Sequence, residues 1–140
     1  MYHLLVAVVV VVLQCINLSN AACKMDATTT PPPLPCALCP TLPLTTAPYH
    51  PTTINSNGVV TDSINAAGCK QYTVNCFAVG TKYVVVGANE QFIQLSQATP
   101  GAKSAVLTCN AQGQIIGNVV PSNMPLTVTS VYCSTQRYNM

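Results

Sequence analysis

Beyond residue 54 the chain alternates between short apolar runs and polar turn residues. Tyr72, Val74 and Cys76 are apolar positions separated by polar neighbours, and this period of two predicts a half-buried β-strand. Residues 82–87 form an apolar run that predicts a fully buried strand. Further strands are predicted at residues 91–95, 105–109 and 126–133. Turn residues separate these runs and helical periodicity is absent, so the pattern predicts an all-β antiparallel sandwich or partial barrel.

The first 22 residues have the features of a signal peptide. An uninterrupted apolar run from Leu4 to Leu13 is too short to span a bilayer, and the small residues Ser19 and Ala21 precede the expected cut. Two alternatives are a buried N-terminal strand and a bacterial lipoprotein signal acylated at Cys23. Because no second long apolar run follows, we expect a secreted, extracellular protein without membrane insertion after cleavage.

Residues 23–53 differ in composition from the rest of the chain. Between Ala27 and Thr53 there are eight prolines and eight threonines. Proline fixes φ and removes backbone donors, so this segment is expected to contain neither helix nor central strand and to be extended and stiff. Outside the cell it could carry O-linked sugars or act as a simple linker, and both interpretations stay open.

Charged residues make up only 6% of the chain, with a net charge of +2. The charges are scattered, so there is no basic patch that would follow a phosphate backbone, and nucleic acid is not an expected partner. Solubility must therefore come from Thr, Ser, Asn and Gln side chains.

The titratable side chains do not form a recognisable catalytic motif. Acid-base catalysis needs carboxylates or histidine close together, whereas Asp26, Asp62, Glu90 and His50 are far apart in the sequence. Cys23 and His50 could form a nucleophile pair, but both lie outside the predicted sandwich. Asp62 and Glu90 are expected to be solvated loop charges. We predict a protein that is not an enzyme and that has no cofactor and no metal site.

Seven of the eight cysteines follow the expected signal peptide. In an oxidising compartment they are expected to form disulfides, which a small β domain needs to supplement its limited core. The Cys36-x-x-Cys39 spacing also suits a zinc half-site or a redox dithiol, but Cys69 and Cys76 lack the spacing of a second zinc pair. Cys23 is left over as a free thiol, an alternative partner or an intermolecular bridge that would make a homodimer.

The arrangement of the other six cysteines resembles a known family. The features are Cys36-Ala-Leu-Cys39-Pro, Gly68-Cys69, Cys76 in a strand, Leu107-Thr-Cys109-Asn-Ala-Gln-Gly113, and Val128-Thr-Ser-Val-Tyr-Cys133. This order resembles the C6 domain of secreted nematode proteins, and the resemblance covers residues 36–133, leaving a tail at 134–140. It implies three disulfides, with Cys36 paired to Cys69. The remaining Cys39, Cys76, Cys109 and Cys133 allow three pairings.

Three kinds of function fit these observations. The first is an extracellular module with a structural, adhesive or interaction role, whose protein or matrix partner the sequence does not name. The alternative is a secreted protease inhibitor or effector that presents a braced loop, for which Asn118–Pro125 is the best candidate. A carbohydrate binder is the third, disfavoured because Trp is absent and Tyr72, Tyr83 and Tyr132 are expected to face the core.

Overall fold

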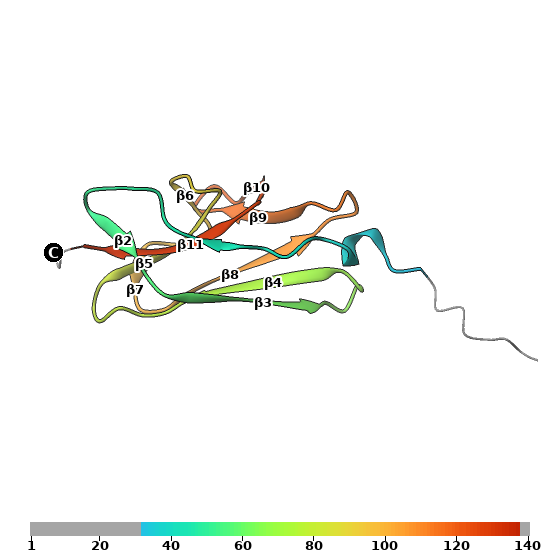
Figure 1. Cartoon of the computed structure of the whole chain (residues 1–140), viewed down its shortest axis with the longest axis horizontal. Helices are drawn as coiled ribbons and strands as arrows, with labels where there is room; N and C mark the ends of the chain where they lie inside the picture. The colour runs from blue at the N-terminus through green and yellow to red at the C-terminus, as the bar shows by residue number, and fades with distance from the viewer. Residues whose placement is uncertain (1–31, 138–140) are drawn as a thin grey trace, which may run out of the picture. The chain divides into compact units, whose positions relative to one another are not determined.

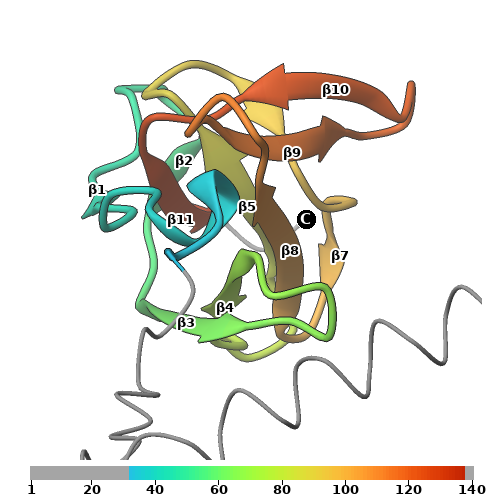
Figure 2. The same cartoon turned by 90° about the vertical axis from the view of Figure 1, so that its right-hand side faces the viewer.

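The computed structural model describes residues 32–137 and confirms the predicted all-β fold. Two sheets face each other across a central core, and almost all neighbouring strands are antiparallel (Figures 1 and 2). Three disulfides join parts of the chain that are distant in sequence. The expected signal peptide at residues 1–22 and Cys23 lie outside the described residues.

The first sheet has five strands in the order β10-β9-β8-β4-β3. Their bounds are β3 (Gly58–Ile64), β4 (Lys70–Cys76), β8 (Lys103–Cys109), β9 (Ile115–Val119) and β10 (Met124–Thr127). Tyr72, Val74 and Cys76 of β4 are buried, whereas their neighbours in the strand are only partly buried. The predicted alternation therefore does place one face of β4 in the core.

The second sheet is built around β11 (Val131–Gln136) and β5 (Tyr83–Ala88), which are antiparallel neighbours. Four short strands complete it, namely β1 (Leu44–Thr45), β2 (Thr53–Asn55), β6 (Ile93–Gln94) and β7 (Thr99–Pro100). β5 occupies one edge of β11 along nearly its whole length. β1 and β2 pair with the other edge of β11, one after the other.

The core lies between the two sheets and is built from alternate residues of each strand. Val84 and Val86 of β5 are fully buried, as is Val131 of β11. The Cys76–Cys133 disulfide crosses this core and joins β4 of one sheet to β11 of the other. Its side chains are 0% and 1% exposed, so the bridge lies at the centre of the sandwich.

The Pro- and Thr-rich segment is part of the fold, and the expectation that it contains no helix is wrong. Pro35–Ala37 forms one turn of 3-10 helix, in which Pro35 occupies a first-turn position that needs no N–H. β1 then pairs in parallel with β11, the one parallel pair in the described sheets. Because β1 lies at an edge, prolines on either side of it cost no central ladder hydrogen bonds.

The strand predicted at residues 126–133 is in fact two strands in different sheets. Residues 128–130 carry the chain from β10 to β11, and the side chain of Asn89 binds this crossing. Its Oδ1 accepts a hydrogen bond from the backbone N–H of Thr129 at 2.8 Å, and its Nδ2 donates to the carbonyl of Thr127 at 2.9 Å. No break separates the two strands in the sequence because apolar residues recur throughout, with Leu126 of β10 partly buried and Val128 in the crossing and Val131 in β11 buried.

Three further expectations are corrected. β11 continues through Gln136 and pairs there with β2, so the domain does not end at Cys133 and residues 134–136 are not a tail. The sequence predicts a strand at residues 91–95, but only the two residues of β6 form one, because residues 91–92 belong to a turn. Of the three tyrosines expected to face the core only Tyr72 does so, since Tyr83 is 39% exposed on the outer face of its sheet and Tyr132 is buried on that same outer face.

Candidate functional site

All six cysteines of the expected framework form disulfides. They pair as Cys36–Cys69, Cys39–Cys109 and Cys76–Cys133. The first pair is the one that the family resemblance implies, and the other two are one of the three arrangements that remained open. Because the sulfurs of Cys36 and Cys39 are bonded, they do not form a zinc half-site. Within residues 32–137 no group of three or more His, Cys, Asp or Glu side chains is arranged to hold a metal.

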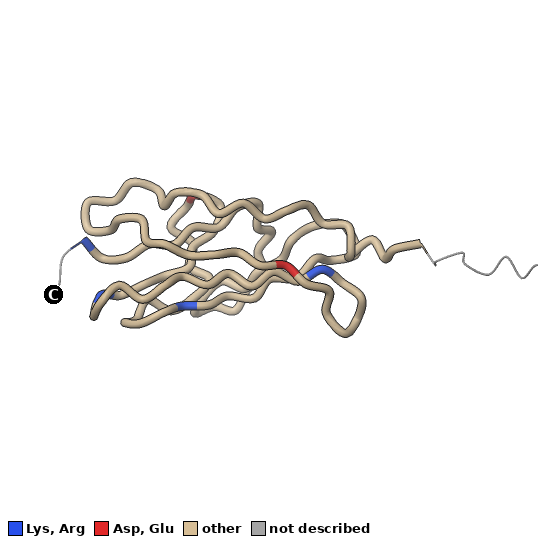
Figure 3. Tube along the Cα trace, turned by 60° about the horizontal axis from the view of Figure 1, so that its bottom comes forward, with Lys and Arg blue, Asp and Glu red and all other residues tan. Residues whose placement is uncertain are grey.

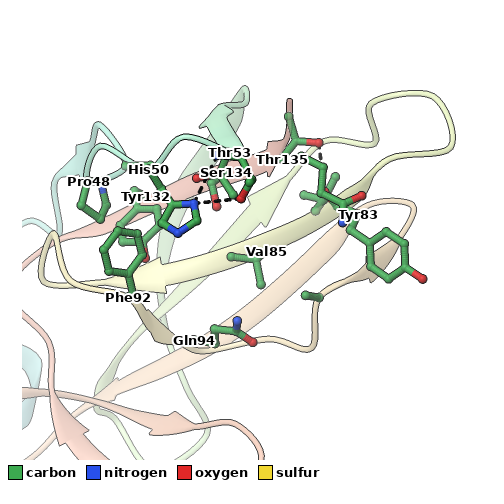
Figure 4. Close-up of a pocket in the computed structure, with 15 residues that line it drawn as sticks. Pro48, His50, Thr53, Tyr83, Val85, Phe92, Gln94, Tyr132, Ser134 and Thr135 are labelled. Carbon is green, nitrogen blue, oxygen red and sulfur yellow. Dashed lines mark hydrogen bonds between the residues drawn. The ribbon is translucent and has the colours of Figure 1, made fainter. Parts of the chain in front are cut away.

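One cavity lies on the outer face of the sheet that contains β5 and β11 (Figure 4). Its volume is about 230 Å³. β11 contributes Tyr132, Ser134, Thr135 and Gln136, while β5 contributes Tyr83, Val84 and Val85. Phe92, Gln94 and Ala98 come from the chain after β5, and Ala47, Pro48, His50, Thr52 and Thr53 come from the Pro- and Thr-rich segment. We call this cavity the outer pocket.

The outer pocket exists because the chain between β1 and β2 leaves the sheet. β1 and β2 pair with the same edge of β11 in opposite directions, so residues 46–52 must reverse between them. Pro48 and His50 in this connection lie over the outer face, as Figure 4 shows. This cover explains why β11 is buried on both faces, with Ser134 only 7% exposed although its side chain points away from the core.

His50 is held at the rim of the outer pocket by local hydrogen bonds. Its Nδ1 accepts a hydrogen bond from the backbone N–H of Thr52 at 3.3 Å and lies 2.8 Å from the hydroxyl of the same residue. A nitrogen that accepts from an N–H carries a lone pair, so in the neutral ring the proton is on Nε2. The imidazole also packs edge to face against Phe92, with ring centroids 5.4 Å apart. His50 thus belongs to the sandwich, contrary to the sequence prediction.

Phe92 is positioned by the turn that follows β5. Asn89 and Glu90 both have positive φ, which reverses the chain so that Phe92 faces the outer pocket. The buried hydroxyl of Tyr132 donates a hydrogen bond to the carbonyl of Gln91 and fixes the turn from below. Phe92 itself remains 62% exposed. A large apolar side chain is therefore held in the solvent by an ordered turn, next to a cavity.

Uncharged polar groups line the floor of the outer pocket. In Figure 4 the hydrogen bonds among the lining residues involve His50 with Thr52 and Thr135 with the carbonyl of Tyr83, the latter at 2.9 Å. The hydroxyl of Ser134 and the amide of Gln94 are not joined to any of the residues drawn. Both side chains line the cavity and carry groups that can donate and accept hydrogen bonds.

The lining of the outer pocket is poor in charged residues. None of its lining residues is Lys, Arg, Asp or Glu. Charged residues are sparse over the described chain as a whole (Figure 3). No carboxylate of the lining therefore orients the imidazole of His50, and the neighbours of this ring are a hydroxyl and a phenyl group.

Sequence reasoning missed the outer pocket because its residues come from four separate stretches of chain. The sequence places His50 in an extended segment, where only a pairing with Cys23 is considered for it, and Phe92 in a predicted strand with no role. A weak signal existed in residues 91–95, where strand alternation would place Phe92 on the same face as Gln94. A large aromatic on a polar face indicates a surface contact.

Asp62 is not a loop charge as predicted but lies within β3, where it pairs with a lysine. The Nζ of Lys70 is 3.2 Å from a carboxylate oxygen of Asp62 and also donates to the carbonyl of Cys39 at 3.3 Å. The same ammonium group lies 5.4 Å from the centre of the Tyr72 ring. Glu90 is exposed in the turn after β5, which agrees with the expectation for it.

Three proton-binding groups make the fold sensitive to alkaline pH. The hydrogen bond to Asp62 raises the pKa of Lys70, and burial raises the pKa of both Tyr72 and Tyr132. The folded chain therefore keeps these protons at a pH where the unfolded chain has begun to lose them. We expect the free energy of unfolding to be constant with respect to these groups below about pH 10 and to fall above it.

Urea unfolding at pH 8 to 11 tests this expectation. The doubly substituted Tyr72→Phe, Tyr132→Phe protein should start less stable, because two buried hydroxyls that donate to carbonyls are lost. Its stability should then decline less steeply with pH than that of the parent. An equal or steeper decline in the double variant would contradict the assignment of the effect to these phenols.

Comparison with known protein families, curated proteins and solved structures finds no match to this chain. Among residues 32–137, no helix has both the length and the apolar character needed to cross a membrane. The three disulfides are compatible with a secreted protein, since such bonds persist in oxidising compartments. The case for function therefore rests on the chain itself.

Proposed function

We propose that this protein is a secreted, non-enzymatic extracellular module that recognises a partner through the outer pocket. The observation that carries the proposal is the exposed Phe92, held beside His50 over an uncharged cavity. An aromatic side chain that is largely in water and fixed by its turn is typical of a contact surface. The disulfide-braced sandwich supplies the rigid support that a preformed site needs.

The extracellular location is supported by two independent features of the chain. Leu4–Leu13 has the length and composition of a signal-peptide core. The six cysteines of the described domain are all oxidised, which is the normal state of such residues outside the cytosol. In this proposal the protein remains similar to the C6 domain, and Cys23 is available to link two copies into a homodimer.

The alternative of an inhibitory loop has less support from the chain. The segment Asn118–Pro125 is a β-hairpin, in which Asn118 pairs with Pro125 and Val119 with Met124. Only residues 120–123 are left as a turn, and inhibitory loops present a longer extended segment to an enzyme. For this reason we place the contact surface at the outer pocket.

The test is a comparison of two variants that each remove one exposed phenylalanine. Phe92→Ala should weaken binding to the extracellular material of the source tissue by about tenfold or more, because a central aromatic contact carries much of the binding energy. Phe77→Ala is the matched control, since Phe77 is 51% exposed and lies outside the outer pocket. Binding of the labelled secreted protein to tissue sections and matrix extracts measures the effect.

Retention of binding by the Phe92→Ala protein would contradict the assignment of recognition to the outer pocket. Equal losses in both variants would do the same, because they would point to a general loss of surface apolarity or of folding. Thermal unfolding of both variants establishes that they fold like the parent.

A further inference from the structure

We infer that the outer pocket binds a neutral saccharide, with one sugar ring seated in it. This inference rests on the proposed recognition function and specifies its ligand class. It also revises an expectation from the sequence, in which Tyr83, an exposed side chain of this pocket, was assigned to the core. Three features of the pocket carry it, namely its exposed aromatic walls, the mixed hydrogen-bonding character of its floor, and its lack of charge.

The aromatic walls are suited to the C–H face of a sugar ring. Phe92 and Tyr83 lie at opposite ends of the outer pocket in Figure 4, and they are 62% and 39% exposed. His50 packs against Phe92 and restrains its ring. Apolar surface left in water is unfavourable, so a ligand with one apolar face gains by covering these rings. A sugar ring has such a face and is polar at its edge.

The floor of the pocket matches the polar edge of a sugar. The hydroxyls of Ser134 and Thr53 and the amide of Gln94 can each donate and accept a hydrogen bond, as sugar hydroxyls can. Proline-rich peptides are the other ligands that aromatic-lined grooves commonly bind. Their proline residues offer carbonyl acceptors and no N–H, so they would leave the acceptors of this floor unpaired. The floor therefore favours the saccharide.

The charge and the volume of the outer pocket restrict the class of ligand further. No described Lys or Arg lines the outer pocket, and Arg137 lines an adjoining groove that shares Pro48 and His50 with it. An acidic or sulfated sugar would need a cation or a cluster of donors to offset its loss of hydration. The volume of about 230 Å³ is smaller than the range of roughly 300–1,000 Å³ that is usual for drug-sized ligands. One uncharged ring is the ligand that these limits describe.

The experiment is an NMR titration of the isotopically labelled, disulfide-intact secreted protein. The probes are neutral monosaccharides, namely hexoses, pentoses, 6-deoxyhexoses and N-acetylhexosamines, followed by a sialylated sugar, a sulfated sugar and a proline-rich peptide. We expect at least one neutral sugar to shift the backbone amide signals of Phe92, Gln94 and Ser134 in a saturable way. Phe92→Ala should raise the dissociation constant about tenfold, whereas Phe77→Ala should leave it unchanged.

Gln94→Ala is the second variant, because this exposed side chain can be removed with little risk to the fold. This variant should raise the dissociation constant of the same sugar by about fivefold, through the loss of one or two hydrogen bonds. Shifts at these amides with the anionic sugars alone, or with none of the sugars, would overturn the inference. Shifts with the proline-rich peptide alone would overturn it too, but would leave the proposed recognition function in place. That function fails separately, if the Phe92→Ala protein still binds tissue.

Discussion

Replacement of both Cys76 and Cys133 by alanine is expected to lower the free energy of unfolding by about 4 kcal/mol. The two cysteines are 57 residues apart, and a loop of this length gives the unfolded chain considerable freedom once the bridge is removed. Such a loss is a large part of the stability of a small domain, about 5–15 kcal/mol in all. The substituted protein should therefore unfold at a clearly lower denaturant concentration than the parent.

The location of this bridge adds to its importance. It is the disulfide that joins the two described sheets, and its sulfurs lie in the centre of the core. Alanine at both positions removes buried atoms as well as the covalent link, so a cavity term adds to the entropic one. Guanidinium unfolding without reductant measures the loss of stability. Because the chain contains no tryptophan, far-ultraviolet circular dichroism is used to follow unfolding.

The matched control is the protein with both Cys36 and Cys69 replaced by alanine. These residues are 33 apart and tie the 3-10 turn to the start of β4, at one end of the sandwich. The shorter loop predicts a cost lower by about 0.5 kcal/mol, before the smaller cavity is counted. An equal or larger loss in this control would contradict the view that the bridge between the sheets is the principal covalent support.

Gly87→Ala is expected to cost about 2–3 kcal/mol, at the upper end of the usual range for overpacking. Gly87 lies directly opposite Tyr132 in the β5–β11 pair, and the phenol ring of Tyr132 covers it. An added Cβ would fall well inside the contact distance of three atoms of that ring. The ring would have to leave its position, and with it the hydrogen bond to Gln91 that fixes the turn carrying Phe92.

The consequence should therefore be seen in the outer pocket as well as in stability. Gly117→Ala is the control, since a Cβ there would meet only the terminal methyl groups of Leu95, Leu107 and Val128 at 3.2–3.3 Å. These methyl groups can shift by a few tenths of an ångström, so the cost should be less than about 1 kcal/mol. Equal losses for the two glycines, measured by urea unfolding, would show that the Tyr132 ring yields more easily than its burial indicates.

A double-mutant cycle tests whether the Tyr132 ring causes the loss of stability in Gly87→Ala. In a Tyr132→Ala background the ring is absent, and Gly87→Ala should then cost about 0.5 kcal/mol or less. A cost that stays at its full size would assign the effect to the backbone of β5 and not to the ring.

Several elements of the fold could be predicted because their signals are local. The alternation of Tyr72, Val74 and Cys76 with polar neighbours identifies a strand with one buried face, and the structure confirms it. The apolar run at 82–87 likewise corresponds to β5, within one residue at each end. In contrast, the run at 126–133 spans two strands, because the alternation of apolar and polar residues continues into the crossing, where Val128 is buried.

The candidate site could not be predicted, because its parts meet only after folding. Proline content predicted an extended segment before residue 54, but neither its 3-10 turn nor its position over one face of β11. Tyr83 was expected in the core because strand alternation does not tell which face is covered. The orientation of the strand depends on the Cys76–Cys133 bridge and the register of β5 with β11.

The sequence by itself determined the β character of the domain, the oxidised state expected of its cysteines and the near absence of charge. These properties follow from residue types and from spacing along one stretch of chain. The tertiary structure decided the disulfide pairs beyond the one implied by resemblance, the division of strands between sheets, and the outer pocket with Phe92 and His50 at its rim. Those properties depend on which distant segments become neighbours, and that is set by the packing of the whole core.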